Sequence, residues 1–207
     1  MAVVDFRLYL VTDRHQTAGR PLLSVLDLAT RAGVRAVQLR ERDLGTRELL
    51  ALAEPIQRTL AVQGAKLLIN DRVDLAMALP SSGVHLRETS LPPAVVRRML
   101  ASDQLLGVSV HSVDGARAAE DQGADFVVLG PVYETPSKRE FGAPLGLRVL
   151  ESAASRVCIP IFGIGGVTAA RAREMRRAGA YGAAVISAVL AADDIASATR
   201  ELLDATT

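Results

Sequence analysis

Short apolar runs alternate with longer amphipathic stretches along the whole chain. The runs are rich in Val, Leu and Ile, and eight of them recur: Phe6–Val11, Ala36–Leu39, Lys66–Ile69, Gly83–Leu86, Leu105–Val108, Phe126–Leu129, Ile159–Phe162 and Gly182–Ile186. Such runs are typical of strands buried on both faces, as in a parallel sheet. Helical spacing marks the stretches between them: Pro21–Ala32, Thr46–Leu60, 73–79, Pro92–Ala101, Val113–Gln122, Leu145–Ser155, Ala169–Ala178 and Asp193–Leu203. The pattern predicts strict alternation of strands and helices.

Two α/β architectures satisfy that alternation, a closed barrel and an open doubly wound sheet. An open sheet usually carries a glycine-rich phosphate turn after its first strand. Here that turn reads V-T-D-R-H-Q-T, and no G-x-G-x-x-G follows. The chain has 207 residues, which suits one domain with one core and a compact barrel of about 25 residues per unit. We therefore predict a single (β/α)8 TIM barrel over residues 1–207.

Charge and composition narrow the range of partners. The chain has 24 Lys and Arg against 23 Asp and Glu, far from the one-signed charge of a nucleic-acid binder. This balance of charge leads us to expect no nucleic acid as a partner. We expect no membrane partner either, because no apolar run is long enough to cross a bilayer. The first residues lack a basic leader, and the single cysteine, Cys158, fits a reducing compartment. We expect a cytoplasmic protein with Cys158 buried; homo-oligomer formation stays open.

Polar side chains gather where the predicted strands end. The carboxyl ends of barrel strands meet at one mouth, so these side chains are expected to converge there. Alternation along the second strand directs Gln38 and Arg40 into the barrel, where Arg40 requires a ligand or a carboxylate such as Glu41. Each such residue has a structural reading of its own, in salt bridges or packing, but together they favour a binding site. The candidates from the second to fifth strands are Gln38, Arg40, Arg42, Asn70, Ser109 and His111.

The last loops suggest a phosphate site. Glycines such as Gly165 and Gly166, after the seventh strand, let backbone N–H groups approach an anion closely. Ile186 and Ser187 follow the eighth strand, and barrel enzymes often bind phosphate at these two loops. The long loop after the sixth strand adds the hydroxyls of Thr135 and Ser137 and the cation of Lys138, as binding loops do.

His111 is the best acid–base candidate among the three histidines. Imidazole titrates near neutrality, so it can take up a proton and return it within one catalytic cycle. His85 also lies at a strand end but suits packing, and His15 is predicted to lie in the first loop. The setting of His111 among anion-binding loops is what favours a catalytic role.

The motifs resemble a known family when taken in order. The segments VQLRERD, INDRVDLA, GVHL, GVSVHS, GADFVVLGPVYETPSKR, FGIGGV and GAYGAAVISAV, within Leu8 to Asp194, are similar to those of thiamin phosphate synthase and its thiazole tautomerase relatives. The resemblance implies a (β/α)8 barrel, a role in thiamin biosynthesis and a thiazole phosphate as the small-molecule partner.

The synthase branch implies Mg2+, because the enzyme joins hydroxymethylpyrimidine pyrophosphate to thiazole phosphate. Its pattern supplies one metal carboxylate at the position of Asp71. It supplies a second in a segment H-x-G-Q-x-D, where this chain has Ser90 in place of the aspartate and Arg87-Glu88 in place of Gly-Gln. A neutral hydroxyl is a poor substitute for a carboxylate, although Glu88 could reach inward instead. The synthase is therefore the second hypothesis.

The tautomerase branch resembles the chain better at these points. It lacks the second aspartate and has counterparts of Arg40-Glu41-Arg42, Ser109-Val110-His111-Ser112 and the segment 134–139; Asp71 is a departure, since some tautomerases have lost it. The resemblance implies aromatisation of a carboxythiazole phosphate by proton transfer through His111, with no cofactor or metal. A third hypothesis is a non-catalytic, regulatory barrel that binds thiazole phosphate.

Overall fold

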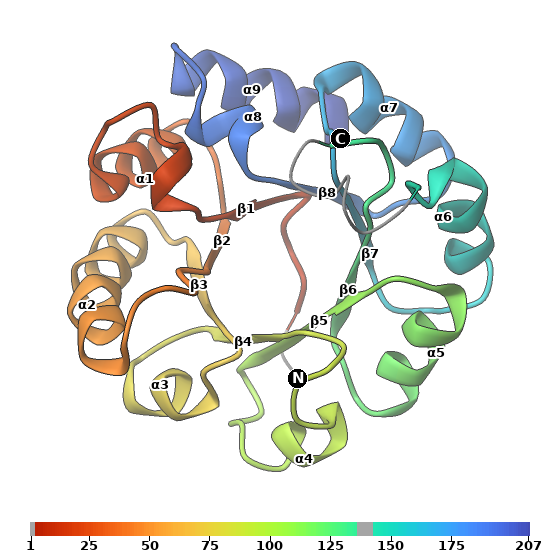
Figure 1. Ribbon diagram of the computed structural model, residues 1–207, viewed down its shortest axis with the longest axis horizontal. Coiled ribbons are helices and arrows are strands. Elements are labelled where there is room, and N and C mark those ends of the chain that lie inside the picture. Colours follow the sequence, from red (N-terminus) through yellow and green to blue (C-terminus); the bar gives the residue numbers. More distant parts are fainter. Residues whose placement is uncertain (1–2, 136–142) are drawn as a thin grey trace.

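Eight parallel strands close into a barrel in sequence order. The computed structural model describes residues 3–135 and 143–207. Its strands are β1 (Leu8–Val11), β2 (Ala36–Leu39), β3 (Lys66–Asn70), β4 (Gly83–Leu86), β5 (Leu105–Val110), β6 (Phe126–Leu129), β7 (Ile161–Ile164) and β8 (Gly182–Val185). Each strand pairs with the next, and β8 pairs with β1 to complete the circle (Figure 1). The predicted (β/α)8 barrel is confirmed.

The helices form the outer ring in Figure 1. They are α1 (Leu22–Arg31), α2 (Thr46–Val62), α3 (Val73–Ala78), α4 (Pro93–Arg97), α5 (Val113–Asp121), α6 (Gly146–Ala154), α7 (Ala169–Arg177), α8 (Ser187–Leu190) and α9 (Ile195–Thr206), with a 3-10 turn at Arg14–Gln16. The hydroxyl of Ser112 accepts a hydrogen bond from the N–H of Gly115 and caps α5. Thr168 caps α7 in the same way, because a hydroxyl satisfies an amide that the first turn leaves unpaired.

The seventh strand lies two residues later than the sequence predicts. Pro160 has no N–H to give to the sheet, and the N–H groups of Cys158 and Ile159 donate instead to the Glu120 carboxylate at 2.7 and 3.1 Å. The strand therefore begins at Ile161. Cys158 is exposed, so the prediction of a buried thiol is wrong. Its side chain lies in this connection and not in the core.

The interior of the barrel is filled by a cluster of aromatic rings. The ring centroids of Phe6, Tyr9, Phe126 and Phe162 lie 5.2 to 6.1 Å apart. All four residues are buried, and Phe6, just before β1, is 3% exposed. Aliphatic side chains fill the separate layer between the strands and the helices. We call the four rings the aromatic floor, because they close the end of the barrel from which the strands start.

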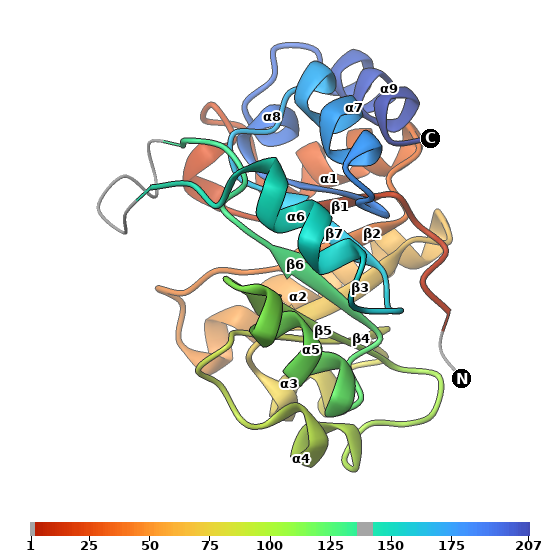
Figure 2. The same cartoon turned by 90° about the vertical axis from the view of Figure 1, so that its right-hand side faces the viewer.

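The two ends of the barrel differ in the residues that cover them. Figure 2 shows the chain's N-terminal segment at the right-hand end, and the loops that follow β6 at the opposite end. In the part of the chain that the structure describes, no helix is both long and apolar enough to span a bilayer. The loops at the left-hand end in Figure 2 form the mouth, and polar side chains gather there.

Candidate active site at the barrel mouth

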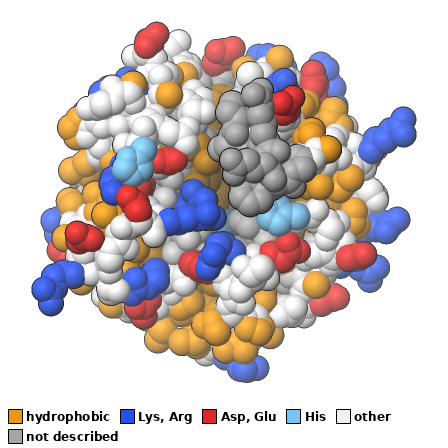
Figure 3. Space-filling model, in the orientation of Figure 1, with side chains coloured by type: hydrophobic (Ala, Val, Ile, Leu, Met, Phe, Trp, Pro, Cys, Tyr) orange, Lys and Arg blue, Asp and Glu red, His pale blue; other side chains and the backbone are white. Residues whose placement is uncertain are grey.

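A cavity of about 790 Å³ opens at the mouth, a size that suits a small ligand. Most predicted site residues line it: Gln38, Arg40, Arg42, Asn70, Ser109, His111, Thr135, Gly165, Gly166, Ile186 and Ser187. Ser137 and Lys138 lie outside the described residues. Figure 3 looks onto the mouth and shows basic side chains on one side of its centre. Position at the carboxyl end of a strand therefore predicted correctly that these residues share one cavity. Their individual roles stay predictions.

A buried histidine stands at the base of the cavity. His85 is 1% exposed, its Nε2 lies 2.9 Å from the Ser109 hydroxyl, and its Nδ1 lies 3.4 Å from the Tyr9 hydroxyl. Burial, helped by the charge of Arg40, lowers the pKa of His85 to about 3. The imidazole is therefore neutral at physiological pH and serves packing and hydrogen bonding, as its sequence position suggested.

Arg40 has no ion-pair or hydrogen-bond partner for its guanidinium within residues 3–135 and 143–207. Its side chain lines the cavity. Burial, followed by repulsion from Arg42, lowers the pKa of Arg40, with Arg87 contributing further repulsion. A guanidinium stays charged under such a shift, so this cation is available to an anionic ligand.

Glu41, the carboxylate that the sequence offered as one possible partner for Arg40, is engaged elsewhere. Its carboxylate accepts hydrogen bonds from the Thr12 hydroxyl at 2.7 Å and from the backbone N–H of Arg14. It also pairs with the Arg14 guanidinium at 3.2 Å. The reason is alternation along the chain, because Glu41 follows Arg40 and turns to the opposite side.

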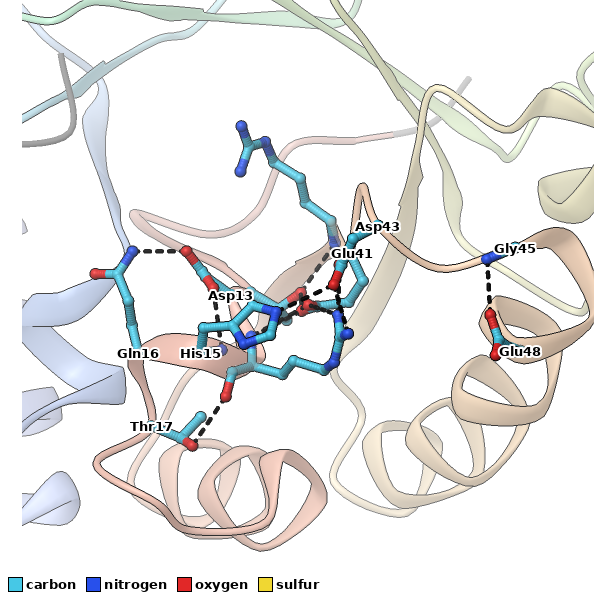
Figure 4. A network of polar contacts seen from close by, with 11 residues as sticks. Asp13, His15, Gln16, Thr17, Glu41, Asp43, Gly45 and Glu48 are labelled. Carbon is cyan, nitrogen blue, oxygen red and sulfur yellow. Dashed lines mark hydrogen bonds and ion pairs between the residues drawn. The ribbon is translucent and has the colours of Figure 1, made fainter.

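The Glu41 contacts belong to a network that fixes the first loop. Arg14 also pairs with Asp43 at 2.5 Å, and the His15 ring lies 3.1 Å from the same carboxylate. The Gln16 amide donates to Asp13 at 2.6 Å. Figure 4 shows Asp13, His15, Gln16, Glu41 and Asp43 together where the first and second loops meet. Gln16, which the sequence did not single out, lines the cavity as a result.

The glycine loop after β7 comes close to neighbouring backbone. Gly165 has a φ of +101° and Gly166 one of +61°, a region that side chains disfavour. A Cβ on Gly165 would lie 2.7 Å from the Cβ of Pro131, and one on Gly166 would lie 2.6 Å from the carbonyl oxygen of Glu134. Only glycine fits at these two positions without a close contact, and both residues line the cavity. The phosphate role stays a prediction.

Arg171 is a cation beside this loop that sequence reasoning missed. Its Nη1 donates to the carbonyl of Gly166 at 2.7 Å, and its guanidinium carbon lies 4.7 Å above the Tyr133 ring centre. Tyr133 in turn donates to Glu174 at 2.5 Å. Arg171 lines the cavity. Its place in the first turn of the helix that follows the glycine pair was the available signal.

His111 lies exposed at the rim of the cavity, after β5. Its Nδ1 is 2.5 Å from the carbonyl oxygen of Gly130. A carbonyl can only accept, so Nδ1 carries the proton, and in the neutral ring Nε2 is left as the basic nitrogen. The ring is thus oriented by the backbone at the end of β6, as a general base requires.

The residues around Asp71 do not fit a magnesium site. One carboxylate oxygen accepts from Arg87, at 2.7 Å from Nε and 2.5 Å from Nη2. The other accepts from the hydroxyl of Ser90. Glu88, the residue that could have replaced the missing carboxylate, lines the main cavity, with its Oε1 2.5 Å from where a Cβ on Gly115 would lie. Among the described residues, no group of three or more His, Cys, Asp or Glu side chains could hold a metal ion.

Comparison with known proteins places the chain in a family. A protein of Geobacter sulfurreducens named "Putative thiamine-phosphate synthase" is 51% identical over 203 residues, covering 98% of this chain and 95% of its own. The "Thiamine-phosphate synthase" of Roseiflexus castenholzii is 43% identical, covering 95% of this chain and 86% of its own. The solved structure of a thiamine phosphate pyrophosphorylase from Pyrococcus furiosus superposes with a TM-score of 0.87 at 33% identity, covering 97% of this chain and 95% of that one. The family model of thiamine monophosphate synthase (TMP-TENI) matches residues 8–189, and the chain therefore belongs to that family.

Proposed function

We propose that the chain acts in thiamin biosynthesis as a tautomerase, which aromatises a carboxythiazole phosphate by moving one proton. Family membership supports the pathway and the thiazole phosphate as ligand. The cavity geometry supports the choice of reaction. The protein is expected to work as a soluble cytoplasmic enzyme on this small molecule.

The ligand is held at two ends of the cavity in this proposal. The backbone N–H groups around Gly165 and Gly166, with Ser187, bind the phosphate, since amides that no Cβ shields are good anion ligands. Arg40 provides a fixed charge from the other side. Thr135 lines the cavity, and Lys138, from the undescribed part of the same loop, is proposed to add a further cation.

His111 moves the proton. Its Nε2, free because Nδ1 donates to Gly130, removes the proton from C2 of the dihydrothiazole ring. The C–H electron pair moves into the ring, the exocyclic double bond opens, and the exocyclic carbon takes up the proton from the imidazolium. No proton is gained or lost overall and no oxidant or reductant is consumed, because the reaction is an isomerisation.

The observation that carries the proposal is the state of Asp71. Both of its carboxylate oxygens are engaged, by Arg87 and by Ser90. Strong Mg2+ binding to protein uses carboxylate oxygens together with substrate phosphates. Arg87 and Ser90 occupy the Asp71 oxygens that would otherwise bind the ion. A reaction that proceeds by proton transfer alone is compatible with this arrangement.

A second candidate is the Mg2+-dependent synthase, which joins a pyrimidine pyrophosphate to thiazole phosphate. The names of the relatives favour it over the tautomerase, since the Roseiflexus protein at 43% identity bears the synthase name. In that case Asp71 would have to leave Arg87 to hold the ion. The two candidates share the thiazole phosphate and differ in the reaction.

Two assays on the purified chain separate the candidates. One supplies the unaromatised carboxythiazole phosphate tautomer with a metal chelator; the other supplies pyrimidine pyrophosphate, thiazole phosphate and Mg2+. We expect turnover in the first, and a loss of about 100-fold or more in His111→Asn with product affinity retained. His15→Asn, an exposed histidine outside the cavity, is the matched control. Thiamin phosphate formation in the second assay alone would replace the tautomerase by the synthase, and thiazole phosphate binding without either reaction would leave a regulatory barrel.

A further inference from the structure

Arg87 is a cation that neither the strand-end prediction nor the proposed reaction uses. It follows β4 and lines both the main cavity and an adjoining one of about 290 Å³. Its Nε and Nη2 are bound to Asp71, and its side chain is 50% exposed. Guanidinium has N–H groups on all three nitrogens. The Asp71 contact therefore fixes the plane of the group and leaves Nη1 available to a ligand.

The Asp71–Arg87 pair is itself held in place. Asp71 has a φ of +64°, an unusual backbone conformation for a residue other than glycine. Its N–H donates to the carbonyl of His85 at 2.8 Å. Ser90 donates its hydroxyl to Asp71 and accepts from the N–H of Arg87 at 3.1 Å. The loops after β3 and β4 are thus joined by contacts around Asp71, whose carboxylate holds the Arg87 guanidinium.

Three guanidinium groups share this side of the mouth. Arg40, Arg42 and Arg87 all line the cavity, and both neighbours oppose the charge on Arg40. Asp71 pairs with Arg87 and fixes the plane of its guanidinium. Like charges near one another destabilise each other unless negative charge lies close by, and at Arg40 the carboxylates of Asp13 and Glu41 oppose the repulsion. The arrangement favours a ligand with a negative group at this position.

The closed strand order places Asp71 and Arg87 on the opposite side of the mouth from the glycine loop. In a ring of eight strands, β3 lies across from β7 and β4 across from β8, as Figure 1 shows. Arg87 therefore lies across the mouth from Ser187, and Asp71 lies across from Gly165. Anion-binding groups at opposite sides fit a ligand that carries a phosphate at one end and a second anion at the other.

We propose that Arg87 binds the ring carboxylate of the carboxythiazole phosphate, and that Asp71 and Ser90 are positioning residues that fix its guanidinium. This inference rests on the proposed function and names the group that selects its substrate. Arg87 thus supplies a permanent positive charge, held by the carboxylate that would otherwise attract a divalent ion. Planar guanidinium matches the geometry of a carboxylate well.

Calorimetry with two ligands tests the proposal without turnover. The ligands are carboxythiazole phosphate and the same thiazole phosphate without its carboxylate. Wild-type protein is expected to prefer the first by about tenfold, the range of one charge-assisted contact. Arg87→Gln should abolish that preference and leave the affinity for the second ligand within about twofold. Asp71→Asn should reduce the preference as well. Arg72→Gln, a neighbouring arginine that pairs with Asp74 and does not line the main cavity, is the matched control.

The outcomes separate the inference from the function. An unchanged preference in Arg87→Gln, or an equal loss for both ligands, would overturn the role of Arg87. Loss of the preference in a protein that lacks tautomerase activity would support the carboxylate contact and overturn the proposed reaction. Failure of both ligands to bind wild-type protein would overturn both.

Discussion

Acidification should destabilise the protein through His85. The ring is 1% exposed and its pKa falls to about 3, because burial and the nearby Arg40 disfavour the charged form. In the unfolded chain the pKa returns to about 6.5. Between these values the unfolded state binds a proton that the folded state refuses. Stability is therefore complete above about pH 6.5 and is lost progressively as the pH falls toward about 3.

The size of the effect follows from the shift. Each pH unit within that window removes about 1.4 kcal/mol. Going from about pH 7 to pH 5 spans about 1.5 units below the unfolded pKa, and so removes about 2 kcal/mol from the free energy of unfolding. Urea unfolding at both pH values measures this loss directly.

His85→Gln isolates the contribution of this one residue. Glutamine keeps a polar group near Ser109 but does not titrate. The free energy of unfolding of the variant should therefore fall between the two pH values by about 2 kcal/mol less than that of wild type. The comparison uses the difference between two pH values, and a uniform loss of stability in the variant therefore cancels. Equal losses in both proteins, within about 0.5 kcal/mol, would refute the reasoning.

Three further predictions concern the mouth. Glu41→Gln removes the charge that Thr12 and Arg14 contact, and should lower the free energy of unfolding by about 3 kcal/mol and Tm by roughly 6–12 °C in a scanning measurement. The control, Asp43→Asn at an exposed carboxylate, should change the free energy of unfolding by less than about 1 kcal/mol. Equal effects of the two substitutions would contradict the network assigned to Glu41. Gly165→Ala should weaken phosphate binding at least about tenfold in calorimetry because of its φ and the contact with Pro131, whereas unchanged affinity would remove the loop from the site. Chelation of metals should leave tautomerase turnover within about twofold, and its abolition would favour the synthase.

Much of the fold could be predicted because barrel geometry follows from repetition. Eight apolar runs separated by helical stretches admit few topologies, and the absence of a glycine-rich first turn selects the closed one. The same rule brought Gln38, Ser109 and Ser187 to a single cavity. Position at a strand end is a property of the chain, so it needs no knowledge of side-chain partners.

Partner choice could not be predicted in the same way. Glu41 binds Arg14 and not the adjacent Arg40, and Asp71 binds Arg87, sixteen residues away. These pairs depend on the direction in which each loop leaves its strand. Cys158 shows the same limit, because an apolar neighbourhood in sequence says little about exposure where Pro160 breaks the sheet pattern.

The aromatic floor closes one end of the barrel, so the cavity opens only at the mouth. With Phe6, Tyr9, Phe126 and Phe162 packed across the barrel below it, a molecule can arrive and leave only between the loops of the mouth. Product and incoming substrate therefore share one path, and each must wait for the other, so product inhibition should be competitive with substrate. For a reaction with two substrates, the one that lies deeper has to load first.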